Sequence, residues 1–294
     1  MPESNETKEQ AEVTPTSVQN PWKVFAIEAF LFSSVLALGI AAAFRINQIL
    51  EIQKNTLPQI SFWKFLIAFF LTTLFIFFIT RFLKFKKEKG TIFKIIFVLA
   101  VALGGLLFLE TWLPEPVPLI LIVFFCFWWW KAPIVLNQDI LIILGIAGIG
   151  STLGLAFQPL MVAVLLIIFS IYDYIAVYKT KHMIKMAKEM IEQKAILALV
   201  APSNVSGFQA SLGEIKPGGK FLILGGGDIA LPLLLCSSLI PVGILNSIIV
   251  AFFSLIGLFV GFYIFARRKA RAPIPALPPI ALFSIIGYLI TLAI

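Results

Sequence analysis

Long apolar stretches, each about the length needed to cross a bilayer, follow one another along most of this chain. Hydrophobic residues make up 60% of the 294 positions and only 13% are charged, whereas about a quarter of a typical soluble domain is charged. A transmembrane helix needs roughly 20 apolar residues, and such stretches fill most of the sequence after Trp22. The sequence therefore predicts an all-α polytopic membrane protein.

The hydropathy pattern divides the membrane portion into nine spans. All six Trp residues lie near predicted span ends, where amphipathic rings prefer the membrane interface. The break between the fifth and sixth spans rests on Gln158 and Pro159. The spans are expected at residues 24–44, 62–82, 92–112, 117–136, 140–157, 160–177, 221–240, 243–265 and 274–294.

The distribution of basic residues predicts the orientation of these spans. Cytoplasmic connections carry an excess of Lys and Arg. In the nine-span arrangement 20 of the 23 basic residues fall on one side, and only Arg45, Lys54 and Lys64 fall on the other. This favours an N-terminus inside and a C-terminus outside. The asymmetry also accounts for the net charge of +8, so no nucleic-acid partner is expected.

The sequence divides into four parts. Residues 1–22 are polar and are expected to form a disordered tail, with no cleavable signal peptide. Residues 23–179 hold the first six spans, and residues 180–219 form a cytoplasmic connection with a short amphipathic helix. Residues 220–294 hold the last three spans. We expect a multi-pass protein of the plasma membrane, surrounded by the lipid bilayer.

Two aspartates lie inside the apolar stretches, Asp173 in the sixth span and Asp228 in the seventh. A carboxyl group in hydrocarbon is energetically costly and indicates a functional site. At about 1.5 Å per residue, both lie roughly 7–11 Å below the same cytoplasmic surface. Consecutive helices tend to be neighbours, so the carboxyl groups are expected to face each other. Two adjacent carboxylates cannot both ionise and divide into an acid and a base, as in aspartic peptide hydrolysis.

Glycine and proline interrupt the sequence beside the second acid and at the ninth span. Gly225, Gly226 and Gly227 directly precede Asp228, although each Gly costs a helix about 1 kcal/mol relative to Ala. They favour a close backbone approach or a late helix start, and the alternative is ordinary helix packing. The Pro275-Ala276-Leu277 segment is expected either to be extended or to begin a helix with proline in its first turn.

Together these motifs resemble the presenilin and signal peptide peptidase family of intramembrane aspartyl proteases, and the chain is similar in plan to an archaeal or other microbial member. The resemblance covers residues 24–294 and rests on Tyr172-Asp173, the GxGD motif ending at Asp228, and the PAL motif, in that order. It implies that Asp173 and Asp228 are the catalytic pair. It also implies that the site is shaped, and the substrate held, by Tyr172, Gly225, Gly226, Gly227, Pro275, Ala276 and Leu277.

The expected function is hydrolysis of peptide bonds within the transmembrane helices of substrate proteins. The two Asp residues would activate a water molecule directly, without a metal or an organic cofactor. An unwound substrate needs partners for its backbone, and residues 225–227 and the PAL segment are expected to offer an edge for strand addition. The sequence leaves open which Asp is the base, the substrate, the cleavage position, autoproteolysis and whether the chain forms a homo-oligomer.

The main alternative is a proton- or cation-coupled transporter, in which intramembrane acids and broken helices also occur. Against it, no inverted repeat pairs the two halves, and the first five spans contribute no deep acid. Serine and zinc intramembrane proteases are excluded, because the only His, His182, lies outside the spans and no His-Glu-x-x-His motif occurs. A prepilin-type peptidase shares the Gly-x-Gly-Asp motif but does not account for the PAL segment.

Overall fold

A computed structural model of the chain describes residues 21–55, 57–82, 86–179, 190–215, 221–267 and 274–293. The expected polar tail and most of the expected amphipathic helix in the 180–219 connection lie outside these ranges. Two short strands and two 3-10 turns interrupt a fold that is otherwise helical in the described ranges. The elements are α1 (Pro21–Gln53), α2 (Phe62–Phe82), α3 (Lys86–Glu110), α4 (Val117–Lys131), α5 (Val135–Leu155), α6 (Pro159–Tyr178), β1 (Ala198–Pro202), η2 (Val205–Gln209), η3 (Leu212–Glu214), β2 (Phe221–Gly225), α8 (Gly226–Ser238), α9 (Ile244–Arg267) and α10 (Leu277–Thr291).

The lengths and composition of the helices are those of an integral multi-pass membrane protein. Within the described ranges, five helical stretches are long and apolar enough to cross a membrane: α1, α5, α6, α9 and residues Phe93–Glu110 of α3. Shorter apolar helices lie at Phe62–Phe75 and at α4, α8 and α10. A helix therefore lies within each of the nine expected spans, and five of these helices are long and apolar enough to cross a membrane.

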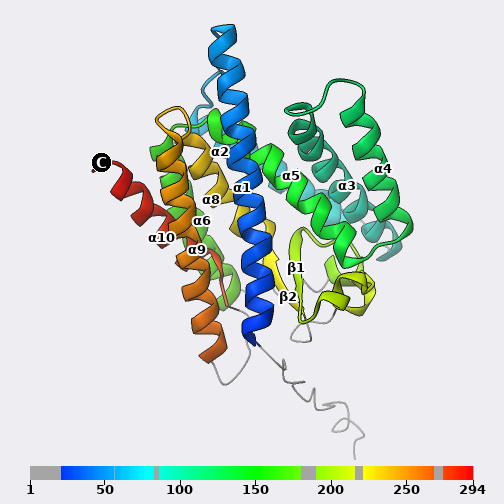
Figure 1. The fold of residues 1–294 in the computed structure, drawn as a ribbon. Helices are drawn as coiled ribbons and strands as arrows, with labels where there is room; N and C mark the ends of the chain where they lie inside the picture. Colours follow the sequence, from blue (N-terminus) through cyan, green and yellow to red (C-terminus); the bar gives the residue numbers. More distant parts are fainter. Residues whose placement is uncertain are drawn as a thin grey trace, which may run out of the picture.

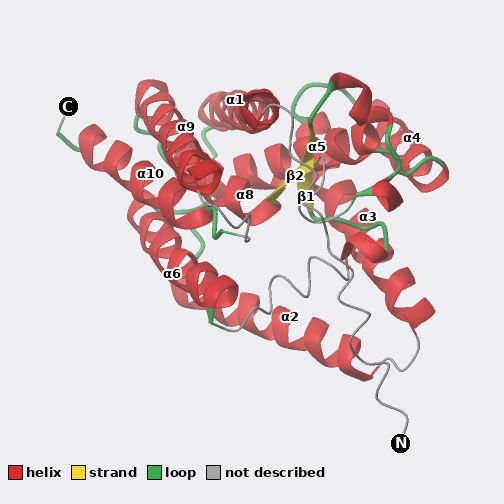
Figure 2. Cartoon of the chain, turned by 90° about the horizontal axis from the view of Figure 1, so that it is seen from below, coloured by secondary structure: helices red, strands yellow, loops and turns green. Residues whose placement is uncertain are grey.

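Helix α8 lies at the centre of the bundle. It packs against α1, α5, α6, α9 and α10, and Figure 2 shows these helices around it, with α3 and α4 grouped beside α5. Residues on all sides of α8 are buried, including Ile229, Leu233 and Leu235, as expected for an apolar helix enclosed by others. The two strands lie beside the start of α8, next to the lower part of α1 (Figure 1).

The seventh predicted span, residues 221–240, is not a single helix. Its first five residues form β2, which pairs antiparallel with β1 from Ala198↔Gly225 to Pro202↔Phe221. Helix α8 then has 13 residues and rises only about 20 Å. The all-helical expectation is wrong here because Phe221 and Ile223 favour strand and the glycines that follow disfavour an early helix start. Backbone of this kind is tolerated at membrane depth only where protein surrounds it.

Helices α3 and α5 cross almost in backbone contact, and this crossing fixes α5 in the bundle. A Cβ atom added to Gly148 would lie 1.9 Å from the carbonyl oxygen of Gly104 and 2.7 Å from the backbone nitrogen of Phe108. A Cβ atom on Gly104 would lie 2.2 Å from the carbonyl oxygen of Gly145. Small residues at a helix crossing allow this close approach. Helix α5 in turn packs against α8, α1 and β1.

Replacing Gly148 with Ala should lower the melting temperature of the protein in detergent. The added methyl group would overlap the α3 backbone, and overpacking of this kind costs about 1–3 kcal/mol of stability. Gly227→Ala is the matched control, since no atom lies within 4 Å of its added Cβ and Ala favours helix. Equal melting temperatures for Gly148→Ala and the wild type would contradict the tight crossing.

Candidate active site

Asp173 lies on α6 and is turned into the protein. Its side chain is only 5% exposed, whereas the neighbouring Tyr172 is 61% exposed. The Asp173 Oδ2 atom accepts a hydrogen bond of 3.3 Å from the backbone N–H of Leu277. Its Oδ1 atom is buried and has no hydrogen-bond partner among the described residues. Asp173 therefore has one oxygen held by backbone and one available, while Tyr172 lies outside the buried site.

The hydrogen bond to Asp173 follows from where α10 begins. The structure places the first helical residue at Leu277, and the preceding Pro275 and Ala276 are not helical. The first N–H groups of a helix have no partner within the helix, so the Leu277 N–H is available to a carboxyl group. The helix-start interpretation of the PAL segment holds, because α10 begins at Leu277 with proline in its first turn. The extended interpretation does not hold at Ala276, whose backbone lies in the right-handed helical region.

Asp228 lies in the first turn of α8, where Gly225 is the residue preceding the helix. Its side chain is 7% exposed, and its carboxyl group interacts with the backbone of Gly225. An acid three residues after the capping residue commonly reaches back to that residue's N–H. The helix N-terminus also carries partial positive charge that favours an acid there. The local geometry of the GxGD motif thus holds this carboxyl group.

The structure brings the two aspartates together. Helices α6 and α8 pack against each other, and the carboxyl groups of Asp173 and Asp228 are close enough to interact electrostatically. Each is held by a backbone group, and each comes from a different helix. Two buried carboxyl groups that interact in this way disfavour ionisation of both at once.

The two remaining glycines of the motif have different surroundings. The Gly226 N–H donates a 3.0 Å hydrogen bond to the Leu197 carbonyl oxygen, and a Cβ on Gly226 would lie 3.1 Å from that oxygen. Gly226 therefore permits the close approach of the chain just before β1. Gly227 has open space around it and lines a cavity.

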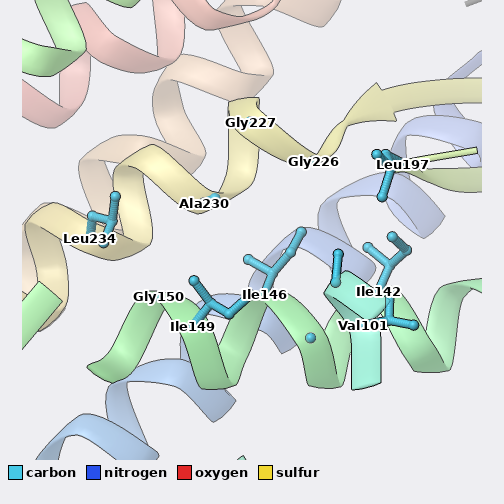
Figure 3. Close-up of a pocket in the computed structure, with 12 residues that line it drawn as sticks. Val101, Ile142, Ile146, Ile149, Gly150, Leu197, Gly226, Gly227, Ala230 and Leu234 are labelled. Carbon is cyan, nitrogen blue, oxygen red and sulfur yellow. The ribbon is translucent and has the colours of Figure 1, made fainter. Parts of the chain in front are cut away.

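This cavity has a volume of about 260 Å³ and lies between α3, α5, the start of α8 and Leu197. Figure 3 shows Gly226, Gly227 and Ala230 of α8 facing Ile142, Ile146 and Ile149 of α5 across it. Its lining is apolar apart from backbone, so it suits an apolar side chain. Among the described residues, no group of three His, Cys, Asp or Glu side chains is placed to hold a metal ion.

Two further acids are buried, and the expectation that the first five spans contain no deep acid is wrong. Glu28 of α1 is 6% exposed and interacts electrostatically with Asp228. Asp139 of α5 is 1% exposed and accepts a hydrogen bond from Val200 in β1. The sequence places Glu28 near a span end, where a side chain can reach the surface. It places Asp139 just before the fifth predicted span, so neither position signals burial.

Comparison with known proteins relates both the sequence and the fold of this chain to one family. The sequence model of the family described as signal-peptide peptidase, presenilin aspartyl protease matches residues 27–294. Comparison with curated proteins gives no significant match.

Two solved structures of a presenilin family intramembrane aspartate protease have a similar fold. The first, in a C222 crystal form, is 20% identical with a TM-score of 0.61, and the match covers 92% of this chain and 98% of that one. The second, in a P2 crystal form, is 23% identical with a TM-score of 0.54 over 89% and 96%.

Proposed function

We propose that Asp173 and Asp228 are the catalytic pair of this chain, which belongs to the signal-peptide peptidase and presenilin family of aspartyl proteases. One observation carries the assignment: two buried carboxyl groups, from α6 and α8, interact in the interior of a membrane protein. A transporter is not supported, because the family match covers the chain from residue 27 to its last residue.

In the proposed mechanism each carboxyl group takes part in activating water. One Asp is ionised and takes a proton from the water as its oxygen attacks the scissile carbonyl carbon, while the other is protonated and donates its proton to the carbonyl oxygen. The product of this step is a tetrahedral diol, with no covalent bond to the enzyme. The Leu277 N–H holds Asp173 Oδ2, which leaves Oδ1 to face the reacting atoms. The protons belong to the pair, so either Asp is able to act as the base.

The edge expected at residues 225–227 is not formed as such, because Gly226 and Gly227 begin α8, and β2 offers an edge for the unwound substrate in their place. In an antiparallel pair alternate residues point their backbone groups to opposite sides. The Gly226 N–H bonds to Leu197, so Ile223 and Gly225 point away from β1. The outer side of β1 is occupied by α5, which donates to Ile196 and accepts from Val200. A substrate strand therefore adds to β2, whose edge leads directly to Asp228.

The apolar helices and the distribution of Lys and Arg support nine crossings with an inside N-terminus, and the proposed location is the plasma membrane. In this arrangement Asp173 and Asp228 lie at a similar depth below the cytoplasmic surface. By resemblance to the family, substrates in this orientation are single-span helices whose N-termini lie outside.

Asp173→Asn and Asp228→Asn should each abolish cleavage of a membrane-helix peptide by the purified protein, because neither remaining acid can serve both roles. Loss of an acid or base typically lowers the rate by about 10²–10⁴-fold. Glu51→Gln, which changes an exposed acid at the end of α1, is the control and should cleave normally. Substantial turnover by either Asn variant, with the fold intact, would remove that residue from the mechanism.

Changes in the PAL segment should impair cleavage without touching either acid. Leu277→Arg buries a charge at a site where the Leu side chain is enclosed. Pro275→Ala lets α10 extend backwards, which would draw the Leu277 N–H into a helical hydrogen bond and away from Asp173. Leu277→Met preserves side-chain volume and is the control. Wild-type rates in both Leu277→Arg and Pro275→Ala would mean that the prolines only start a helix.

The orientation is tested with single cysteines in a background without Cys126 and Cys236. A cysteine replacing Lys87 should react with a membrane-impermeant thiol reagent only from the cytoplasmic side, because basic connections stay inside. A cysteine replacing Ile294 should react only from the outside. The reverse pattern would invert the topology and the direction of the preferred substrates, and labelling of both positions from one side would rule out an odd number of crossings between residues 87 and 294.

A further inference from the structure

A buried hydrogen-bond network connects the start of α5 to the chain that leads into β1. The Asp139 Oδ1 atom accepts a 2.9 Å hydrogen bond from the Val200 N–H. The Gln138 side-chain amide donates to the Ile196 carbonyl oxygen and accepts a 2.8 Å hydrogen bond from the Trp129 indole N–H. Asp139, Gln138 and Trp129 are all almost fully enclosed. Interior polar groups of this kind must be paired.

These contacts fall on the side of β1 that faces away from β2. Because alternate residues of a strand point to opposite edges, Val200 and Ile196 present their backbone groups outward when Leu197 faces β2. Every residue of β1 is buried, so water does not satisfy those groups. Side chains of α5 take the place of a third strand. An unpaired backbone N–H in this position would destabilise the fold.

The turn that follows β1 is fixed to the same end of α5. The Val135 N–H donates to the Ala210 carbonyl oxygen, and the Leu212 N–H donates to that of Pro133. Ile134 and Ser211 form an isolated β-bridge. The start of α5 therefore contacts the segment on both sides of β1, while its middle is held by α3.

The same contacts reach the candidate active site through the sheet. β1 pairs with β2 over five residues, and the Leu197 carbonyl oxygen fixes the Gly226 N–H. Asp228 follows two residues later, in the first turn of α8. The position of Asp228 relative to α5 thus depends on where β1 lies.

We propose that Asp139 is a positioning residue for the reaction: by holding the Val200 N–H it fixes β1, and through the β1–β2 pair it fixes Asp228 and the edge that receives the substrate. This proposal rests on the proposed function of Asp228 but not on its protonation. Asp139 acts with one accepting oxygen, since its Oδ2 atom has no partner among the described residues. An asparagine, which keeps that acceptor, should therefore replace it.

The test compares Asp139→Asn with Asp139→Leu in cleavage of a membrane-helix peptide and in hydrogen exchange of the backbone. Asp139→Leu should lower kcat/KM by about 10–100-fold, the scale on which small misplacements of reacting groups act. Amides of residues 196–201 and 221–228 should exchange faster in that variant. Asp139→Asn should restore both activity and protection, because its Oδ1 still accepts from Val200.

Asn137→Leu is the matched control, because Asn137 is buried in the same turn of α5 but its side chain donates to Ala132, not to the β1 segment. It should cleave and exchange like the wild type. If Asp139→Leu does not fold, Gln138→Met supplies the second variant. The Met side chain keeps a similar volume but loses the hydrogen bonds to Ile196 and Trp129. This variant should also lower kcat/KM and speed hydrogen exchange of the β1 amides.

Three outcomes would overturn the proposal. One is wild-type cleavage and exchange in Asp139→Leu, or in Gln138→Met where that variant replaces it. Another is an Asp139→Asn variant as inactive as Asp139→Leu with a protected β1, which would assign Asp139 to carboxyl chemistry. The third is an Asn137→Leu variant as defective as Asp139→Leu, which would indicate general weakening of α5. Inactivity of the wild type would instead reject the proposed function, and the exchange measurement would still decide whether Asp139 holds β1.

Discussion

A carboxyl group enclosed in a membrane protein needs hydrogen-bond donors, and in this chain backbone N–H groups provide them. All three aspartates of the sequence are buried. Asp173 is held by Leu277, Asp139 by Val200 and Asp228 by the backbone of Gly225. These donors are neutral, so they fix an oxygen without forcing the group to remain ionised, as a neighbouring cation would. Two acids held in this way are able to keep a shared proton between them.

Backbone donors are available only where regular structure begins or has an edge, and this explains the irregular parts of the fold. A continuous seventh helix would use the N–H groups near Asp228 for its own hydrogen bonds. Ending β2 at Gly225 and starting α8 at Gly226 releases them. The strand that results needs a partner and a covered outer side, because lipid offers neither. β1 is that partner, and the start of α5 covers the outer side of β1. Helix α5 therefore supports the site, although we assign no catalytic group to its side chains.

The sequence predicted the positions of the helices well because the length of an apolar run is a strong local signal. It also predicted that Asp173 and Asp228 face each other, since acids in such runs stand out and their distances from the span ends give similar depths. Strand β2 was not predicted, because a buried strand and a buried helix are both uninterrupted apolar runs over five residues. Asp139 was missed because its partner Val200 lies 61 residues away, and Asn137-Gln138-Asp139 resembles a polar connection. Glu28 was missed because burial by α8 is a tertiary effect.

The prolines at the ninth span show how composition limits the number of backbone donors at a helix start. The first four N–H groups of a helix are unpaired, and in an enclosed site each would need its own acceptor. Helix α10 begins at Leu277 and continues with Pro278 and Pro279, and proline has no N–H. The first turn therefore presents the Leu277 N–H without two further donors beside it, and that N–H bonds to Asp173. The PAL segment thus contributes to the site through the Leu277 N–H, beside which Pro278 and Pro279 supply no further donors. This explains how a sequence without an ionisable side chain takes part in holding an acid.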